Sequence, residues 1–103
     1  RIGGSDLNPY LAIASQIAAG IAGIDQKLEL EPEFVGDAYQ SGQARSIPTN
    51  LVAATKALSA SSMLREAFGS EVIDHYVHAA NWEQESFERI VTDYEVKRGF
   101  EQV

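Results

Sequence analysis

The apolar positions along the chain recur mostly at three- and four-residue steps, which is the spacing of amphipathic helices. The most apolar stretch follows Asn8, a favourable N-cap, and Pro9, whose missing N–H is not needed in a first helical turn. One stripe of this stretch contains Leu11, Ala14, Ala18, Ile21 and Ala22, and a second contains Ile13, Ile17, Gly20 and Ile24. The pattern predicts a helix from Pro9 to about Lys27 that is apolar nearly all round and therefore buried among partners.

The middle of the chain predicts a loop followed by a second helix. Residues 28–31 alternate apolar and polar side chains, as a short extended segment does. Pro32 prevents the first helix from continuing, and residues 36–48 are rich in Gly, Ser and Gln, which favours a loop. Thr49 is the predicted N-cap of the second helix.

The last 40 residues predict one short helix, one long helix and a final short one. The first covers residues 63–68, after a break in the serine-rich stretch that precedes it, and Gly69 closes it. Ser70 is the predicted cap of the long helix. Thr92 and Glu95 fit a capping box, so a break is expected near Thr92 and the last helix is expected to begin at Asp93 or Tyr94. The apolar stripe of this region contains Ile73, Tyr76, Val77, Ala80, Phe87, Ile90, Val91 and Tyr94.

The composition agrees with one helical unit. The chain has 103 residues, 45% of them hydrophobic and 22% charged, which is typical of a single globular domain. It has no cysteine, which excludes a disulfide framework and thiolate metal sites. Its net charge of −7 argues against a general nucleic-acid or anionic-membrane surface. We expect residues 1–103 to form one mainly α unit without an internal domain boundary.

Nothing in the sequence favours a membrane or secreted location. The chain shows no signal peptide and no run of about 18 apolar residues. A membrane span is the alternative interpretation of the first helix, but its apolar run is about 15 residues and contains Gln16, which is short for a span. We therefore expect a cytoplasmic protein.

Two histidines of the long helix have residue types suited to a metal site. His75 and His78 are three residues apart, and Asp74 and Glu71 are near enough in sequence to add ligands. The alternative is that both histidines lie on the polar shoulder of a surface helix. That alternative is favoured because no third His or Cys exists to complete a closed site.

Two further segments before and after the first helix have weaker signals. Glu29, Glu31 and Glu33 share one side of the predicted extended segment and could hold a divalent cation, or form a solvated charged edge. The Gly3–Ser5 segment could offer backbone N–H groups to a phosphate. A plain turn is the alternative there, because Asp6 would repel an anion and no phosphate-binding motif is present.

Five segments, in the same order along the chain, carry the motifs of one enzyme family. They read RIGGSDLNPYLA at residues 1–12, AAGIAGI at 18–24, QKLELEP at 26–32, DHY at 74–76 and TDYEVKRGFE at 92–101. They resemble the R-x-P-G-A-D-A-N-P-Y-L-A, A-A-G-L-x-G-I, N-K-L-E-L-E-P, D-H-Y and T-D-W-E-x-x-R-Y-F-E segments of the glutamine synthetase family. The resemblance implies the helical C-terminal part of that family's α+β catalytic domain.

The resemblance also implies the activity of a parent enzyme. Family members are ligases of nitrogen metabolism that use ATP with Mg²⁺ or Mn²⁺ to phosphorylate the γ-carboxylate of glutamate. Ammonia or an amine then displaces the phosphate. The G-G-S-D and L-E-L-E-P segments are closer to glutamine synthetase-like and γ-glutamylpolyamine synthetase relatives than to the nitrogen-assimilation enzyme. The sequence does not predict the amine acceptor.

Arg1 alone matches a functional position of the family, an arginine near the substrate glutamate and the transferred phosphate. The resemblance therefore implies Arg1 as a substrate-binding residue, and it places the catalytic, metal-binding and ATP-binding residues outside residues 1–103. Gly3 stands where proline is common in the family. Tyr39 falls in the loop where some bacterial members carry an adenylylated tyrosine, but residues 37–42 lack the N-L-Y-D-L-P-P context. An ordinary loop tyrosine is the favoured alternative.

We expect the chain to serve as scaffold and subunit interface of such a ligase and to be inactive alone. Its expected partners are the rest of the catalytic domain and further copies in a double ring, with no nucleic acid or membrane. Some members lock one ring onto the other with the final helix, so Phe100 is expected to be a buried anchor. The rival is a non-enzymatic helical interaction module with His75 and Trp82 on a partner surface. Independently of this choice, the helical spacing of Tyr76, Trp82 and Phe87 is typical of core or interface aromatics.

Overall fold

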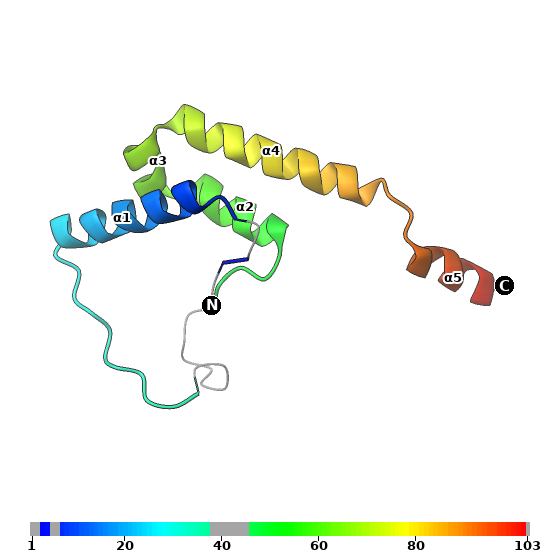
Figure 1. Ribbon diagram of the computed structural model, residues 1–103, viewed down its shortest axis with the longest axis horizontal. Coiled ribbons are helices and arrows are strands. Elements are labelled where there is room, and N and C mark those ends of the chain that lie inside the picture. The colour runs from blue at the N-terminus through cyan, green and yellow to red at the C-terminus, as the bar shows by residue number, and fades with distance from the viewer. Residues whose placement is uncertain (1–2, 5–6, 38–45, 103) are drawn as a thin grey trace.

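The computed structural model describes residues 3–4, 7–37 and 46–102, and these residues form five α-helices without a strand (Figure 1). The helices are α1 (Pro9–Asp25), α2 (Leu51–Ala60), α3 (Ser62–Phe68), α4 (Ser70–Glu88) and α5 (Asp93–Glu101). The prediction of a mainly α chain is confirmed. The alternating segment at 28–31 lies outside any helix and pairs with no strand in the described part of the chain.

Helix α1 begins at a side-chain cap and ends at a backbone turn. The Asn8 side-chain oxygen accepts hydrogen bonds from the backbone N–H groups of Tyr10 (3.0 Å) and Leu11 (3.3 Å), so the predicted cap is confirmed. The helix ends at Asp25 in a Schellman turn, in which the Leu28 N–H donates to the Gly23 carbonyl at 3.0 Å. Lys27 adopts the left-handed conformation of this turn, with φ 52°. The helix is therefore two residues shorter than predicted.

Two predicted caps are wrong by one residue. Asn50, and not Thr49, caps α2, because its side-chain oxygen accepts from the Ala53 N–H at 2.8 Å. Ser70 does not cap α4 but is its first helical residue. Gly69 occupies both the C-cap of α3 and the N-cap of α4, with φ 88° and ψ 147°, so the two helices meet at one glycine without a side-chain cap. Gly69 as the end of α3 is as predicted.

The helices pack around a small core. Helix α2 packs along α4, and α3 contacts both α1 and α4 (Figure 1). Ile73 of α4 is 3% exposed, and Thr55 of α2 is buried with its hydroxyl donating to the Leu51 carbonyl at 2.8 Å. Helix α5 lies beyond the end of α4, after the connection at residues 89–92. The predicted capping box is present at its start, with both Thr92 and Glu95 hydrogen bonds formed.

The described surface is much larger than that of a compact domain. The radius of gyration is 18.4 Å, where a compact domain of 100 residues has about 13 Å. The accessible surface is 9447 Å², compared with about 5,700 Å² expected for a folded monomer of this mass. Many large apolar side chains are therefore exposed to solvent.

Helix α1 is exposed in the chain by itself, so its predicted burial among partners stays a prediction. No residue of α1 is buried, and Ile13, Ile17, Ile21 and Ile24 are exposed, because α3 covers only one side of the helix. Within the described residues, no helix is long and apolar enough to span a lipid bilayer.

Candidate functional site

The predicted substrate-binding residue, Arg1, lies outside the described residues, as do Ser5, Asp6 and Tyr39. The described neighbours of Arg1 are Gly3, Gly4 and the start of α1. A β-carbon added at Gly3 would overlap the Leu7 side chain, so Leu7 lies against the glycine backbone. A residue with a β-carbon at this position would therefore force the Leu7 side chain to move.

The two candidate metal clusters are not assembled. His75 and His78 are exposed on α4, and the His75 ring meets the Tyr76 ring edge-on, with centroids 5.4 Å apart. Glu29, Glu31 and Glu33 are exposed along the segment after α1. In the described part of the chain, no three His, Cys, Asp or Glu side chains converge as a metal ion requires. The surface interpretation of the histidines is the one that the geometry supports.

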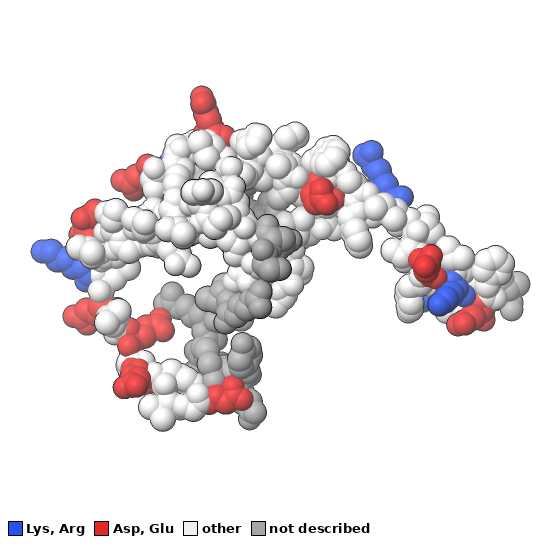
Figure 2. All heavy atoms as spheres, viewed as in Figure 1, with Lys and Arg blue, Asp and Glu red and all other residues white. Residues whose placement is uncertain are grey.

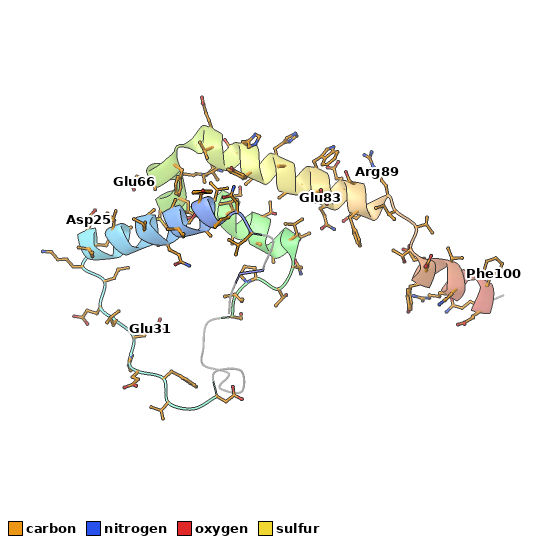
Figure 3. The ribbon with its side chains drawn as sticks, viewed as in Figure 1. Asp25, Glu31, Glu66, Glu83, Arg89 and Phe100 are labelled. Atoms are coloured by element: carbon orange, nitrogen blue, oxygen red, sulfur yellow. The ribbon has the colours of Figure 1, made fainter. Side chains whose placement is uncertain are left out.

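A broad groove lies between α1 and α3. It encloses about 630 Å³. Its walls are mainly apolar, and Asp25 at the end of α1 and Glu66 on α3 are its charged lining residues (Figure 3). The sequence analysis did not find this groove, because the apolar stripe of α1 does not tell which side α3 covers.

A smaller apolar pocket lies where four helices approach one another. It encloses about 310 Å³ and has Ser15 as a polar member, whose hydroxyl donates to the Leu11 carbonyl at 2.8 Å. The pocket is lined by Leu11, Ser15, Leu58, Leu64, Phe68, Val72, Ile73 and Tyr76. The lining of this pocket is therefore mainly apolar, and Ser15 and Tyr76 are its two hydroxyl-bearing residues.

The aromatic and aliphatic side chains toward the C-terminus are exposed. Trp82 and Phe87 on α4 are 63% and 60% exposed, so they are not core residues of this chain, and an interface role is the alternative that remains. On α5, Tyr94 and Phe100 are 70% and 82% exposed. Figure 2 shows acidic side chains at intervals over the visible face, with wide uncharged surface between them. The described residues thus leave large apolar side chains exposed on α1, α4 and α5.

The chain matches known proteins over its whole length. The family "Glutamine synthetase, catalytic domain" matches residues 1–99. The chain is 43% identical over 103 residues to gamma-glutamylethanolamide synthetase GlnA4 of Streptomyces coelicolor, a match that covers 100% of the chain and 22% of the relative. It is 38% identical to type-1 glutamine synthetase 2 of Dictyostelium discoideum, with 98% of the chain and 20% of the relative covered.

A third relative has a different amine in its name. The chain is 34% identical over 100 residues to glutamate–isopropylamine ligase of a Pseudomonas species, with 95% of the chain and 22% of the relative covered. The chain thus spans about one fifth of the length of each of these relatives. Since the family matches 99 of the 103 residues and the described residues are mainly helical, the chain belongs to the glutamine synthetase family and is a helical part of its catalytic domain.

Proposed function

We propose that the chain is the C-terminal part of an ATP-dependent ligase that joins the γ-carboxylate of glutamate to ammonia or an amine through γ-glutamyl phosphate. The observation that carries this proposal is the match over the entire chain to a gamma-glutamylethanolamide synthetase, together with the match to the catalytic domain of the family. The relatives are named for glutamine, ethanolamide and isopropylamine products or substrates, so they share glutamate and differ in the amine.

The proposed role of residues 1–103 is that of scaffold and subunit interface in a cytoplasmic double-ring oligomer. The exposed isoleucines of α1 support this role, because a monomer rarely leaves several hundred Å² of contiguous apolar surface in water. The large radius of gyration supports it as well, since the helices leave much of their surface uncovered. The rest of the catalytic domain and further copies of the ligase are the partners that would cover these faces.

ATP and Mg²⁺ or Mn²⁺ belong to the proposed ligase, but the described residues do not fit a metal site. No three potential ligands converge among them, and the two histidines are on the open surface of α4. The metal and nucleotide contacts are proposed to lie in polypeptide outside residues 1–103.

Arg1 is the one residue of the chain that we propose to contact the substrates. A guanidinium fixed near the γ-phosphoryl group would stabilise the negative charge that develops there during transfer, because charge-assisted hydrogen bonds to phosphate oxygens are strong. The resemblance of residues 1–12 to the family segment that begins with this arginine supports this role. Arg1 precedes α1 by a few residues, and the start of α1 is fixed by the Asn8 cap. Tyr39 is proposed to be an ordinary loop residue.

The chain alone is proposed to be inactive. Phosphoryl transfer depends on positioning and on charge stabilisation by metal ions and cationic groups, and one arginine does not supply these. The experiment is a chimera in which this chain replaces the matching segment of the Streptomyces coelicolor synthetase. ADP release is measured with ATP, Mg²⁺, glutamate and a panel of amines, for the chimera and for the chain alone.

The chimera should release ADP in the presence of glutamate and an amine, and an Arg1→Ala chimera should lose most of this activity. The chain alone should show none. Turnover of about 1 s⁻¹ by the chain alone would contradict the scaffold role, because that rate is within the range of ordinary enzymes. A folded chimera without ligase activity would favour the rival, a helical interaction module with His75 and Trp82 on its partner surface.

A further inference from the structure

We propose that Gly3 and Leu7 are positioning residues for Arg1. The Leu7 side chain packs on the bare backbone of Gly3, and this contact restrains the segment that carries the Arg1 guanidinium to the substrates. The inference rests on the proposed function, because Arg1 is the residue proposed to contact those substrates. It deepens that proposal by assigning the two residues on which the placement of Arg1 depends.

The Leu7 side chain lies where a side chain of residue 3 would be. A β-carbon added at Gly3 would overlap Leu7 Cδ2 and would lie 3.8 Å from Leu7 Cγ, so the leucine occupies the space over the glycine backbone. Gly3 is not needed for its backbone angle, because the glycines with positive φ in the described part of the chain are Gly36 and Gly69. It is the missing side chain of Gly3 that admits Leu7.

Gly3 differs in this respect from five other glycines in the described part of the chain. An added β-carbon meets no atom within 4 Å at any of these five, which are Gly20, Gly23, Gly36, Gly69 and Gly99. At those positions a glycine makes no room for a neighbouring side chain. The contact between Gly3 and Leu7 is therefore a specific feature of the segment before α1.

Leu7 is itself held at the start of α1. It directly precedes Asn8, whose side-chain oxygen accepts hydrogen bonds from the N–H groups of Tyr10 (3.0 Å) and Leu11 (3.3 Å). An apolar residue in this position commonly packs against the fourth residue of its helix, which here is Ala12 and offers only a methyl group. The Leu7 side chain lies against Gly3, so the contact joins a fixed helix start to the segment that precedes it.

Arg1 is close enough to Gly3 for this restraint to affect it. Two residues of fully extended chain span at most about 7 Å, so the Arg1 Cα lies within that distance of the Gly3 Cα. A guanidinium that stabilises charge on a phosphoryl group must be in place before the charge develops. A misplacement of about 1 Å at a reaction centre can lower the rate by about 100-fold. A contact that restrains residues 3 and 7 therefore bears on the rate of phosphoryl transfer.

The first test is a double-mutant cycle in the chimera with the Streptomyces coelicolor synthetase. Gly3→Ala displaces the Leu7 side chain and Leu7→Ala removes it, so each variant breaks the same contact. Each should lower kcat for ADP release by about tenfold and leave the KM for glutamate nearly unchanged, because Arg1 acts on charge that develops in the transition state. The double variant should be no slower than either single variant.

Two results of this cycle would overturn the inference. One is a double variant whose loss is the product of the two single losses, because the two residues would then act independently. The other is a single variant with a raised KM and an unchanged kcat. Leu7→Met is the conservative control, because methionine keeps a long apolar side chain over Gly3, and it should retain most of the parental kcat. A Leu7→Met variant as slow as Leu7→Ala would also overturn the inference.

Thermal midpoints are recorded for all variants, so that kcat is compared among folded proteins. Gly3→Ala adds an atom in an occupied place and is the variant most exposed to misfolding. Leu7→Ala and Leu7→Met add no side-chain heavy atom, so the comparison between these two decides the question if Gly3→Ala does not fold.

The second test does not depend on turnover. Phenylglyoxal modifies arginine guanidinium groups, and mass spectrometry of the Arg1 peptide gives the rate of modification with and without ATP, Mg²⁺ and glutamate. In the unsubstituted chimera the substrates should slow the modification of Arg1 by about fivefold or more, because a guanidinium bound to phosphate oxygens is protected. In Gly3→Ala and in Leu7→Ala this protection should be mostly lost. Equal protection in all three proteins, or none in any, would overturn the inference.

The two tests separate this inference from the proposed function. An active chimera in which Gly3→Ala and Leu7→Ala are as fast as the unsubstituted protein contradicts this inference alone. A folded but inactive chimera contradicts the proposed ligase function. If Arg1 of that inactive protein is protected only while the contact between Gly3 and Leu7 is intact, the positioning role stands.

Discussion

Arg65 and Asp74 form an ion pair across the bend between α3 and α4, with the guanidinium Nη2 2.7 Å from the carboxylate Oδ1. The same guanidinium donates from Nε to the Ser59 carbonyl at 3.1 Å, near the end of α2. The Arg65 side chain is 27% exposed, and Asp74 is more open. One side chain thus links three helices near the core residue Ile73.

Arg65→Ala should destabilise the helical unit by about 1 kcal/mol. The loss combines a half-exposed ion pair, worth about 0.2–1 kcal/mol, with a charge-assisted hydrogen bond. The measurement is the urea midpoint by circular dichroism. Arg89→Ala is the control, because the Arg89 guanidinium is 4.0 Å from the Glu85 carboxylate and largely exposed. The urea midpoint of Arg89→Ala should equal that of the unsubstituted chain. If Arg65→Ala and Arg89→Ala had the same urea midpoint, the Arg65 contacts between the helices would not stabilise the folded chain.

Local features of the fold were predictable from sequence, whereas this ion pair was not. The Thr92–Glu95 capping box was predicted because both partners lie within one turn of backbone. Arg65 and Asp74 are nine residues apart on different helices, so their pairing depends on the bend at Gly69. The direction of that bend follows from backbone angles that the residue pattern does not specify.

The errors in the predicted caps have a related cause. Thr49 and Asn50 are both residue types that cap helices, and the choice between them depends on which one has the extended backbone and reaches the third N–H. The burial of α1 among partners was predicted from its apolar composition. Composition indicates that a helix needs to pack against other elements, but it does not identify those elements. The only residue assigned to substrate, Arg1, came from resemblance and lies outside the described part of the chain.

Gly69→Ala should destabilise the unit by about 1–3 kcal/mol. Gly69 has φ 88° and ψ 147°, a conformation that residues with a β-carbon rarely adopt. No atom lies within 4 Å of the added methyl group, so the effect arises from backbone strain and not from a clash. Thermal unfolding followed by circular dichroism measures it.

Gly99→Ala is the matched control for that glycine. Gly99 lies inside α5 with a helical backbone and open space around it, so the alanine should stabilise α5 by about 1 kcal/mol through helix propensity. Opposite signs for the two substitutions are therefore expected. If Gly69→Ala left the free energy of unfolding unchanged, α3 and α4 could be joined through a backbone conformation other than the one observed at residue 69.

The chain alone should self-associate through α1, or else be poorly ordered there. Ile13, Ile17, Ile21 and Ile24 are all exposed, and such a row of apolar side chains is a strong driving force for association. Sedimentation over a range of concentrations measures the mass, and hydrogen exchange across residues 12–24 measures order. Ile17→Glu should reduce association. A compact monomer with slow exchange throughout this segment would contradict the expectation.

Phe100 should be an anchor of the full-length ligase. Helix α5 has nine residues and lies beyond α4, and a helix that short is marginal without tertiary packing. Phe100 is 82% exposed in the chain, so we expect its pocket to come from another part of the proposed ligase or from a neighbouring subunit. Full burial of a phenylalanine is worth about 2–3 kcal/mol, and truncation in a packed site costs at least as much.

Phe100→Ala in the full-length chimera should therefore lower the stability of the oligomer by about 3 kcal/mol or more. Native mass measurement during a thermal or urea titration would detect ring dissociation before global unfolding. Lys97→Ala on the same helix is the control, because Lys97 is charged and exposed and truncation to alanine keeps helix propensity. If Phe100→Ala left oligomer assembly and thermal stability unchanged, α5 would be a solvent-exposed end of the proposed ligase. Removal of the phenyl group of a buried anchor would instead weaken the contact between α5 and its neighbour.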